Sequence, residues 1–294
     1  MAVVSLSALA YCAGPEDDVA GVEGPGDLPD QKRPAVDPAS PPSRPGGWGL
    51  VFSDEFSGED GRAPDPRRWQ HDVGGGGWGN GELQRYTASP RNARTDGRGR
   101  LLVEALRERV SRDDRDDDER KTRFTSARIS TKGRFTTRYA RAEARIRLPA
   151  GQGLWPAFWL SGVCEDGWPA CGEIDVLESV DEVPMMVRSR IHGPGPLATP
   201  GIGPDWQVDT RLDEGFHVYA VEWTRDRVDF FFDDHRYATI HRDDLPEDDV
   251  WALDHPMRLL LNVAVGGRWP GAPDEGTPFP ATMLVDWVRV YERI

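Results

Sequence analysis

Long hydrophobic runs and an excess of positive charge are both missing from this sequence. No apolar stretch approaches the roughly 18 residues of a membrane-spanning helix, so we expect no membrane-spanning segment. The 294 residues carry 50 acidic and 36 basic side chains, a net charge of −14. Because phosphate backbones and anionic membranes attract basic proteins, this balance argues against both as partners, nucleic acid included. A neutral ligand is compatible with it.

Cysteines number only three, at Cys12, Cys164 and Cys171. No Cys/His spacing typical of a zinc site is present. Cys164 and Cys171 flank a short loop, where two interpretations stay open: a local disulfide that braces the loop, or two buried free thiols.

The N-terminal residues do not resemble a globular domain. Residues 1–13 are mildly apolar, but they lack a positively charged start and their apolar core is short. They are either the remnant of an export or lipoprotein signal, with Cys12 as the lipidated residue, or a disordered or misplaced start. Residues 14–47 are rich in Pro, Gly and Asp and lack aromatic residues, which predicts a disordered linker. We therefore expect a signal remnant and linker in 1–47 and one folded domain, which would carry the function, in 48–294.

Short strands dominate the pattern after Trp48, and Gly- and Pro-rich turns separate them. No long helical pattern appears, although residues 242–251 have room for one short helix. Many strands without helical crossovers predict an all-β fold, an antiparallel β-sandwich of jelly-roll type. The mixed-charge run 107–121 is predicted to be a solvated loop. The strand-like segments are 101–105, 142–148, 216–223, 228–232, 257–265 and 283–291.

Three carboxylates, Glu173, Asp175 and Glu178, fall within one short strand-like segment. Side chains alternate along a strand, so Glu173 and Asp175 share a face, whereas Glu178 comes one residue late. A β-bulge at Val176–Leu177 would return Glu178 to that face. Acids held close together repel and raise each other's pKa, which a fold tolerates mainly where chemistry requires it. The alternative is a solvated acidic strand face.

Tryptophan is abundant, with eleven residues. Trp155 and Trp159 lie four apart just upstream of the acids, while Trp78, Trp168 and Trp269 lie in Gly- or Pro-rich segments. Core packing is the usual fate of an indole, but loop tryptophans are harder to bury. Indoles also stack on the apolar faces of sugar rings, so this arrangement beside an acidic strand indicates a carbohydrate cleft.

From Trp48 to Ile294 the sequence resembles glycoside hydrolase family 16, in particular its bacterial laminarinases (endo-1,3-β-glucanases). The resemblance implies a curved jelly roll with the substrate cleft on its concave face. The bulged spacing of the acids is the laminarinase-like version. The departures are small: Val176–Leu177 replaces the more usual Ile-Met, and Ser179 stands where an aromatic residue is common. The matching motifs are 52–56, 78–86, 126–129, 131–133, 151–160, 167–178, 192–195, 254–256, 261–267 and 285–291.

The resemblance also implies a mechanism, a retaining double displacement that needs no cofactor. Glu173 would be the nucleophile, and Glu178 the general acid and then the base. Asp175 would hydrogen-bond to the nucleophile and help to keep Glu178 protonated.

The same resemblance assigns roles in substrate binding. Trp155 and Trp159 would stack below the cleaved sugar. Asn80, Arg128 and His192 would contact sugar hydroxyls. Trp269 is a further candidate on the other side of the cleft.

A structural calcium ion is a further expectation. Its ligands would be the backbone oxygens of Glu55 and Gly99 and the side chain of Asp286, with Gly97 as the alternative to Gly99.

The expected partner is a neutral β-glucan polysaccharide, bound by a monomer outside the cell or at the cell surface. Other interpretations stay open: a non-catalytic β-glucan-binding protein, a 1,3-1,4-β-glucanase, a galactan or agar hydrolase, or a transglycosylase.

Overall fold

The computed structural model describes residues 47–108, 124–246 and 249–294. The predicted signal remnant with its Cys12, residues 14–46 of the linker, and residues 109–121 of the charged run lie outside the described residues. Within the described part, no helix is long and apolar enough to cross a membrane.

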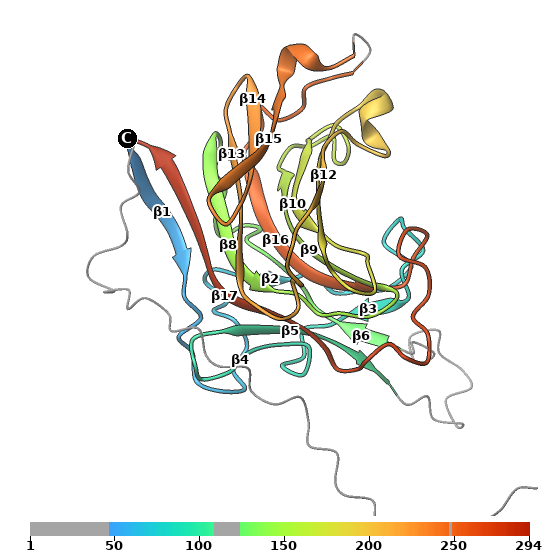
Figure 1. Ribbon diagram of the computed structural model, residues 1–294. Helices are drawn as coiled ribbons and strands as arrows, with labels where there is room; N and C mark the ends of the chain where they lie inside the picture. Colours follow the sequence, from blue (N-terminus) through green and yellow to red (C-terminus); the bar gives the residue numbers. More distant parts are fainter. Residues whose placement is uncertain (1–46, 109–123, 247–248) are drawn as a thin grey trace, which may run out of the picture. The chain divides into compact units, whose positions relative to one another are not determined.

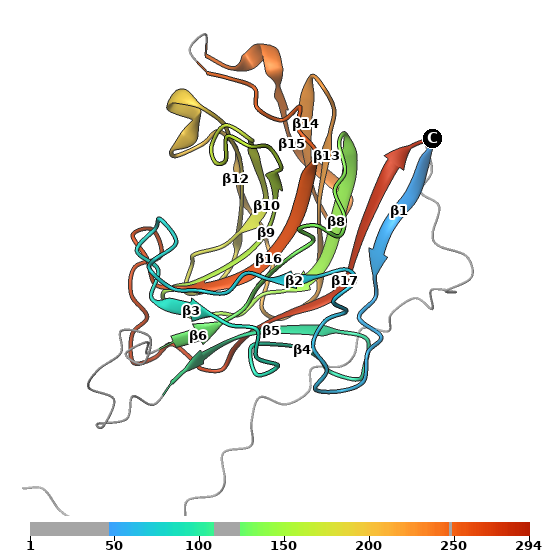
Figure 2. The ribbon, with the colours of Figure 1, turned by 180° about the vertical axis from the view of Figure 1, so that it is seen from behind.

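Two β-sheets pack against each other (Figure 1). The ten-stranded sheet has the order β15-β14-β13-β8-β17-β5-β6-β3, with β1 paired to β17 and β4 paired to β5. β1 lies beside β17 in both views (Figure 1, Figure 2). Its strands are β1 (Trp48–Asp54), β3 (Gln84–Tyr86), β4 (Ala93–Thr95), β5 (Leu101–Arg107), β6 (Phe124–Ser126), β8 (Ala140–Arg147), β13 (His217–Trp223), β14 (Arg227–Phe232), β15 (His235–His241) and β17 (Ala281–Arg293).

The seven-stranded sheet has the order β12-β11-β10-β9-β16-β7-β2. All described strand pairs are antiparallel except β3–β6, which is parallel. The predicted antiparallel all-β sandwich is therefore confirmed. Its strands are β2 (Gln70–His71), β7 (Arg128–Ser130), β9 (Leu154–Gly162), β10 (Glu173–Glu178), β11 (Met186–His192), β12 (Asp205–Gln207) and β16 (Met257–Val265).

Helical structure in the described residues is limited to two 3-10 turns, η2 (Gly195–Ala198) and η3 (Arg242–Asp244). The short helix expected within 242–251 is thus reduced to the single turn η3.

The core lies between the two sheets. Phe158 and Leu160 of β9, Leu261 of β16, and Ala142 and Ile146 of β8 all belong to one buried apolar cluster. Because side chains alternate along a strand, the other residues of β9, β10 and β16 project from the opposite face of the seven-stranded sheet. That sheet curves, and its outer face is the concave one (Figure 1). Alternation thus decides which side chains reach a substrate.

Candidate catalytic site on the seven-stranded sheet

A bulge in β10 places the three acids on one face. Asp175 pairs with Trp159 of β9, but the next paired residue is Leu177, opposite Phe158. The pairing with β11 is interrupted between Asp175 and Glu178 in the same way. The bulge predicted at Val176–Leu177 is confirmed, and it returns Glu178 to the face of Glu173 and Asp175.

The neighbouring strand β11 lines the acids with basic side chains. Its alternate residues His192, Arg190 and Arg188 pair in register with Glu173, Asp175 and Glu178, respectively. His192 was expected at the site. Arg188 and Arg190 were missed, although a count back from His192 in steps of two along β11 would have found them.

Burial raises the pKa of all three acids. It holds the pKa of Glu173 well above its ordinary value, and the negative charge of Asp175 adds to the rise. Burial raises the pKa of Asp175 to about 7, against the opposing effect of Arg190. Burial and the Asp175 charge raise the pKa of Glu178 to about 8, although the Trp155 hydrogen bond lowers it. Close to neutral pH the three carboxyls therefore share protons.

Exposure distinguishes the members of the cluster. The Glu173 side chain keeps 16% of its surface exposed and that of Asp175 only 6%. Glu173 is thus the more accessible of these two acids, and the positive charge of Arg128 opposes the rise in its pKa.

His192 is held between a backbone carbonyl and the acids. Its Nδ1 lies 2.9 Å from the carbonyl oxygen of Ala198, and its Nε2 lies 3.0 Å from Asp175 Oδ2 and 4.0 Å from Glu173 Oε1. A carbonyl oxygen only accepts, so Nδ1 carries the proton that is donated to Ala198. Gly201 fits here because a Cβ at that position would come within 2.6 Å of the ring. The imidazole therefore has a fixed orientation with Nε2 toward the acids.

Trp155 and Trp159 lie on the acid face and are half-buried, as the four-residue spacing predicts. Trp155 Nε1 donates to Glu178 Oε1 at 2.9 Å, and Trp159 Nε1 donates to Asn262 Oδ1 at 2.8 Å. Each indole N–H is thus fixed, while the ring remains partly open to a ligand. The sequence had not indicated Asn262, which pairs with Arg128 across β16 and β7.

Arg128 joins the site to the loop that carries Trp78. Its guanidinium lies 4.7 Å from the ring centre of Trp159 and 4.9 Å from that of Trp78, and its Nε donates to Asp72 at 3.1 Å. Asn80 lies further out, exposed in the same loop, where its amide donates to Glu82 at 3.0 Å. The structure thus brings Arg128 to Trp159 and leaves Asn80 at the rim.

Trp269 lies directly beside Trp155, and its expected contact with substrate stays a prediction. The two rings meet edge to face, with centres 5.2 Å apart. Backbone contacts fix this position, because the Arg268 N–H donates to Asn80 O at 2.9 Å and thus ties the Trp269 loop to the loop of Asn80. Arg188 lies 5.7 Å from the Trp269 ring centre, so this indole flanks the Glu178 end of the site.

Cys164 and Cys171 form a disulfide, which settles the choice between a bridge and free thiols. The bridge closes the loop between β9 and β10. The same loop carries Trp168, which is 56% exposed and has its ring centre 6.5 Å from that of His192. The loop therefore presents an indole at the Glu173 end of the site.

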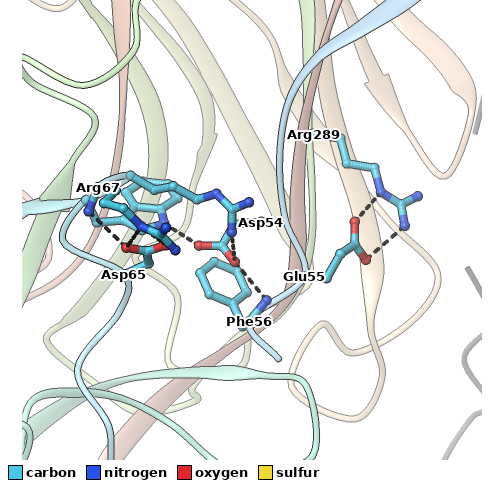
Figure 3. A network of polar contacts seen from close by, with 8 residues as sticks. Asp54, Glu55, Phe56, Asp65, Arg67 and Arg289 are labelled. Carbon is cyan, nitrogen blue, oxygen red and sulfur yellow. Dashed lines mark hydrogen bonds and ion pairs between the residues drawn. The ribbon is translucent and has the colours of Figure 1, made fainter. Parts of the chain in front are cut away.

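The residues of the expected calcium site belong to the other sheet and its loops: Asp286 lies in β17, Glu55 directly follows β1, and Gly97 and Gly99 lie in the turn between β4 and β5. Asp286 lies at an irregularity in the pairing of β17 with β8, and its carboxylate accepts a hydrogen bond from Arg145 at 2.8 Å. The Glu55 carboxylate forms a two-pronged ion pair with Arg289, at 2.9 and 3.1 Å (Figure 3). Oxygen donors of this kind suit calcium, although an ion at Asp286 would share that carboxylate with Arg145. The roles of Glu55, Gly99 or Gly97, and Asp286 stay predictions.

Two buried glutamates on one face, with a third acid between them, are groups that can supply the nucleophile and the general acid for cleavage of a glycosidic bond. Half-buried indoles on the same face supply surfaces for sugar rings. The fold and the site thus define a glycoside hydrolase. Residues 95–289 match the family model for glycosyl hydrolases family 16, and the chain belongs to that family.

Relatives of known activity support this assignment. The chain is 41% identical over 256 residues to a β-glucanase of Rhodothermus marinus. That alignment covers 83% of this chain and 85% of the relative. It is 34% identical over 256 residues to a glucan endo-1,3-β-glucosidase of Cryptopygus antarcticus, with 83% and 88% covered. The laminarinase catalytic domain of Thermotoga maritima superposes with a TM-score of 0.77 at 40% identity, and 85% of this chain and 100% of that chain are covered.

Proposed function

We propose that the protein is an endo-acting, retaining hydrolase of 1,3-β-glucan, acting on laminarin-like chains outside the cell. The observation that carries the proposal is the bulged β10, which presents Glu173, Asp175 and Glu178 together beside Trp155. The activities named for the β-glucanase and laminarinase relatives support the choice of substrate.

The reaction begins with Glu173. In its ionised form it attacks the anomeric carbon while Glu178 protonates the leaving glycosidic oxygen, and a glycosyl-enzyme forms. Glu178 is then the base that removes a proton from water, whose oxygen attacks the anomeric carbon and releases Glu173. Asp175 lies between the two glutamates. When one of them is negatively charged, a proton on Asp175 avoids the repulsion of a second negative charge beside it.

The decisive experiment compares Glu173→Gln and Glu178→Gln with the control Glu59→Gln, a carboxyl in the loop after β1 whose side chain is 81% exposed. We expect both site variants to lose at least about 10³-fold of laminarin hydrolysis, because each removes a group that the reaction cannot replace. They should still bind laminari-oligosaccharides in calorimetry. Substantial turnover by either variant would refute the assignment of roles.

The substrate is tested with laminarin, lichenan, agarose and xyloglucan in parallel, with product sizing. We expect laminarin to give short oligosaccharides from an early stage, with retained configuration at the new end by NMR. Cleavage of agarose or xyloglucan alone would overturn the substrate. Binding of laminarin without product would favour a recognition protein.

We also propose that calcium binds at Glu55, Gly99 and Asp286 and stabilises the fold. If so, the melting temperature should rise with added calcium after treatment with EDTA, and Asp286→Asn should remove that response. A response that is unchanged in Asp286→Asn would place any calcium elsewhere.

A further inference from the structure

The imidazole of His192 and two of the acids meet in a way that the hydrolytic reaction does not require. His192 Nε2, Asp175 Oδ2 and Glu173 Oε1 form a group in which every pair of ligand atoms lies within 4.8 Å. It is the only group of three His, Cys, Asp or Glu ligands found in the described ranges 47–108, 124–246 and 249–294.

When the His192 imidazole is neutral, no positive charge lies between it and Asp175. Since Nδ1 donates its proton to Ala198, the neutral imidazole has a lone pair at Nε2, which faces Asp175 Oδ2 at 3.0 Å. Asp175 is 96% buried, and its Oδ2 has no hydrogen-bond partner. Two acceptors this close need a positive ion between them, and either a proton or a metal ion can supply it.

The spacing fits a tetrahedral metal. Bonds of about 2.0–2.1 Å at tetrahedral angles put ligand atoms about 3.3 Å apart. The observed separations from Nε2, 3.0 Å to Asp175 and 4.0 Å to Glu173, lie on either side of that value. The hydrogen bond from Nδ1 to a carbonyl is the contact that commonly orients a metal-binding histidine.

We propose that Glu173, Asp175 and His192 form a binding site for a divalent transition metal of the zinc class, and that the bound ion inhibits the enzyme. One nitrogen and two oxygens are suitable donors for zinc, with water as the fourth ligand. The ion would occupy the lone pair with which Glu173 attacks the sugar. Inhibition therefore rests on the proposed function, whereas metal binding does not.

The site should discriminate between metals. Calcium and magnesium prefer sets of oxygen ligands, so replacing one oxygen with an imidazole disfavours them. A site that also took calcium equally well would be a cluster of acids rather than the one proposed.

The experiment is zinc titration of the full chain by calorimetry, with His192→Gln compared with His217→Gln. His217 is a matched control, because one of its ring nitrogens also contacts an aspartate, Nδ1 to Asp233 at 2.6 Å, but it belongs to no group of three such ligands in the described residues. We expect His192→Gln to weaken one saturable zinc site at least about tenfold, because the loss of a direct ligand should cost more affinity than the loss of a residue that only orients one, which costs about 10–100-fold. His217→Gln should leave it unchanged. Circular dichroism checks the fold, and if His192→Gln does not fold, Glu173→Gln takes its place and should lose the same site.

Two results would overturn the proposal: no saturable zinc site in the wild type, which would mean that a proton alone fills the contact, or equal zinc binding by His192→Gln. Laminarin hydrolysis measured in parallel distinguishes a failure of the metal-site proposal from a failure of the proposed function. Hydrolysis that zinc does not inhibit would refute the inhibition, and zinc binding without any hydrolysis would refute only the proposed function.

Discussion

Glu178 is a buried carboxyl. Burial and the negative charge of Asp175 both make its ionised form unfavourable. Its pKa is raised from 4.5 to about 8, so the folded protein keeps this proton over a range where the unfolded chain has lost it. The unfolded state then binds fewer protons, and the free energy of unfolding must fall as the pH rises from about 4.5 to 8. The site reduces the stability of the fold at neutral pH.

Glu178→Gln should therefore be more stable than the wild type at pH 8. The gain should be at most about 3–5 kcal/mol, since one pKa unit corresponds to about 1.4 kcal/mol and the neighbouring acids share the cost. It should disappear near pH 4, where both states hold the proton. Urea unfolding at the two pH values measures this, with Glu59→Gln as the control that shows no such difference. A wild type more stable than Glu178→Gln at pH 8 would contradict the burial argument.

Trp155 opposes that rise in pKa through its indole N–H. The 2.9 Å hydrogen bond favours the charged form of Glu178, so Trp155→Phe, which keeps a ring and loses the donor, should raise the pKa of Glu178 further. The alkaline limb of kcat/KM should move up by about one pH unit, since a hydrogen bond to a charged group contributes roughly 1.5–3 kcal/mol. Trp159→Phe is the matched control, because its N–H bonds to Asn262 instead. A shift to lower pH in Trp155→Phe would reject this role.

The elements around the acids show what local sequence can and cannot predict. The bulge in β10 follows from alternation alone, because Leu177 stands where the third acid should be. Trp155 and Trp159 share its face for the same reason. The position of Trp269 does not follow from any local pattern, because it depends on a loop-to-loop contact between Arg268 and Asn80.

The loop between β9 and β10 is braced by a disulfide and carries Trp168 to the edge of the site. The bridge joins cysteines seven residues apart, which in the chain-entropy account contributes about 2.5 kcal/mol to the free energy of unfolding. Cys164→Ser/Cys171→Ser should lose about that much in urea unfolding. Because the loop holds Trp168 near His192, KM for laminarin should rise while kcat changes little. A fall in kcat at constant KM would mean that the bridge positions the acids rather than the indole.

On the scale of the whole molecule, strand content and sandwich architecture could be predicted, whereas strand order could not. β16 and β17 come last in the chain, yet each occupies an interior position in its sheet. Such pairings join residues far apart in sequence, so their partners are chosen by the burial of both sheets together and leave no short-range signal. This is also why Arg128 of β7 meets Asn262 of β16 without a motif that links them.

Charge is the other property of the whole molecule that bears on its substrate. The net charge of −14 creates a field that acts on charged ligands and has no net effect on a neutral glucan. We expect kcat/KM for laminarin to change less than about twofold between 0.05 and 0.5 M NaCl, although the Debye length shortens several-fold over that range. Sulfated laminarin of matched length should be the poorer substrate at low salt and should improve as screening increases. A steep loss of laminarin activity with salt would show instead that long-range charge guides binding of the substrate.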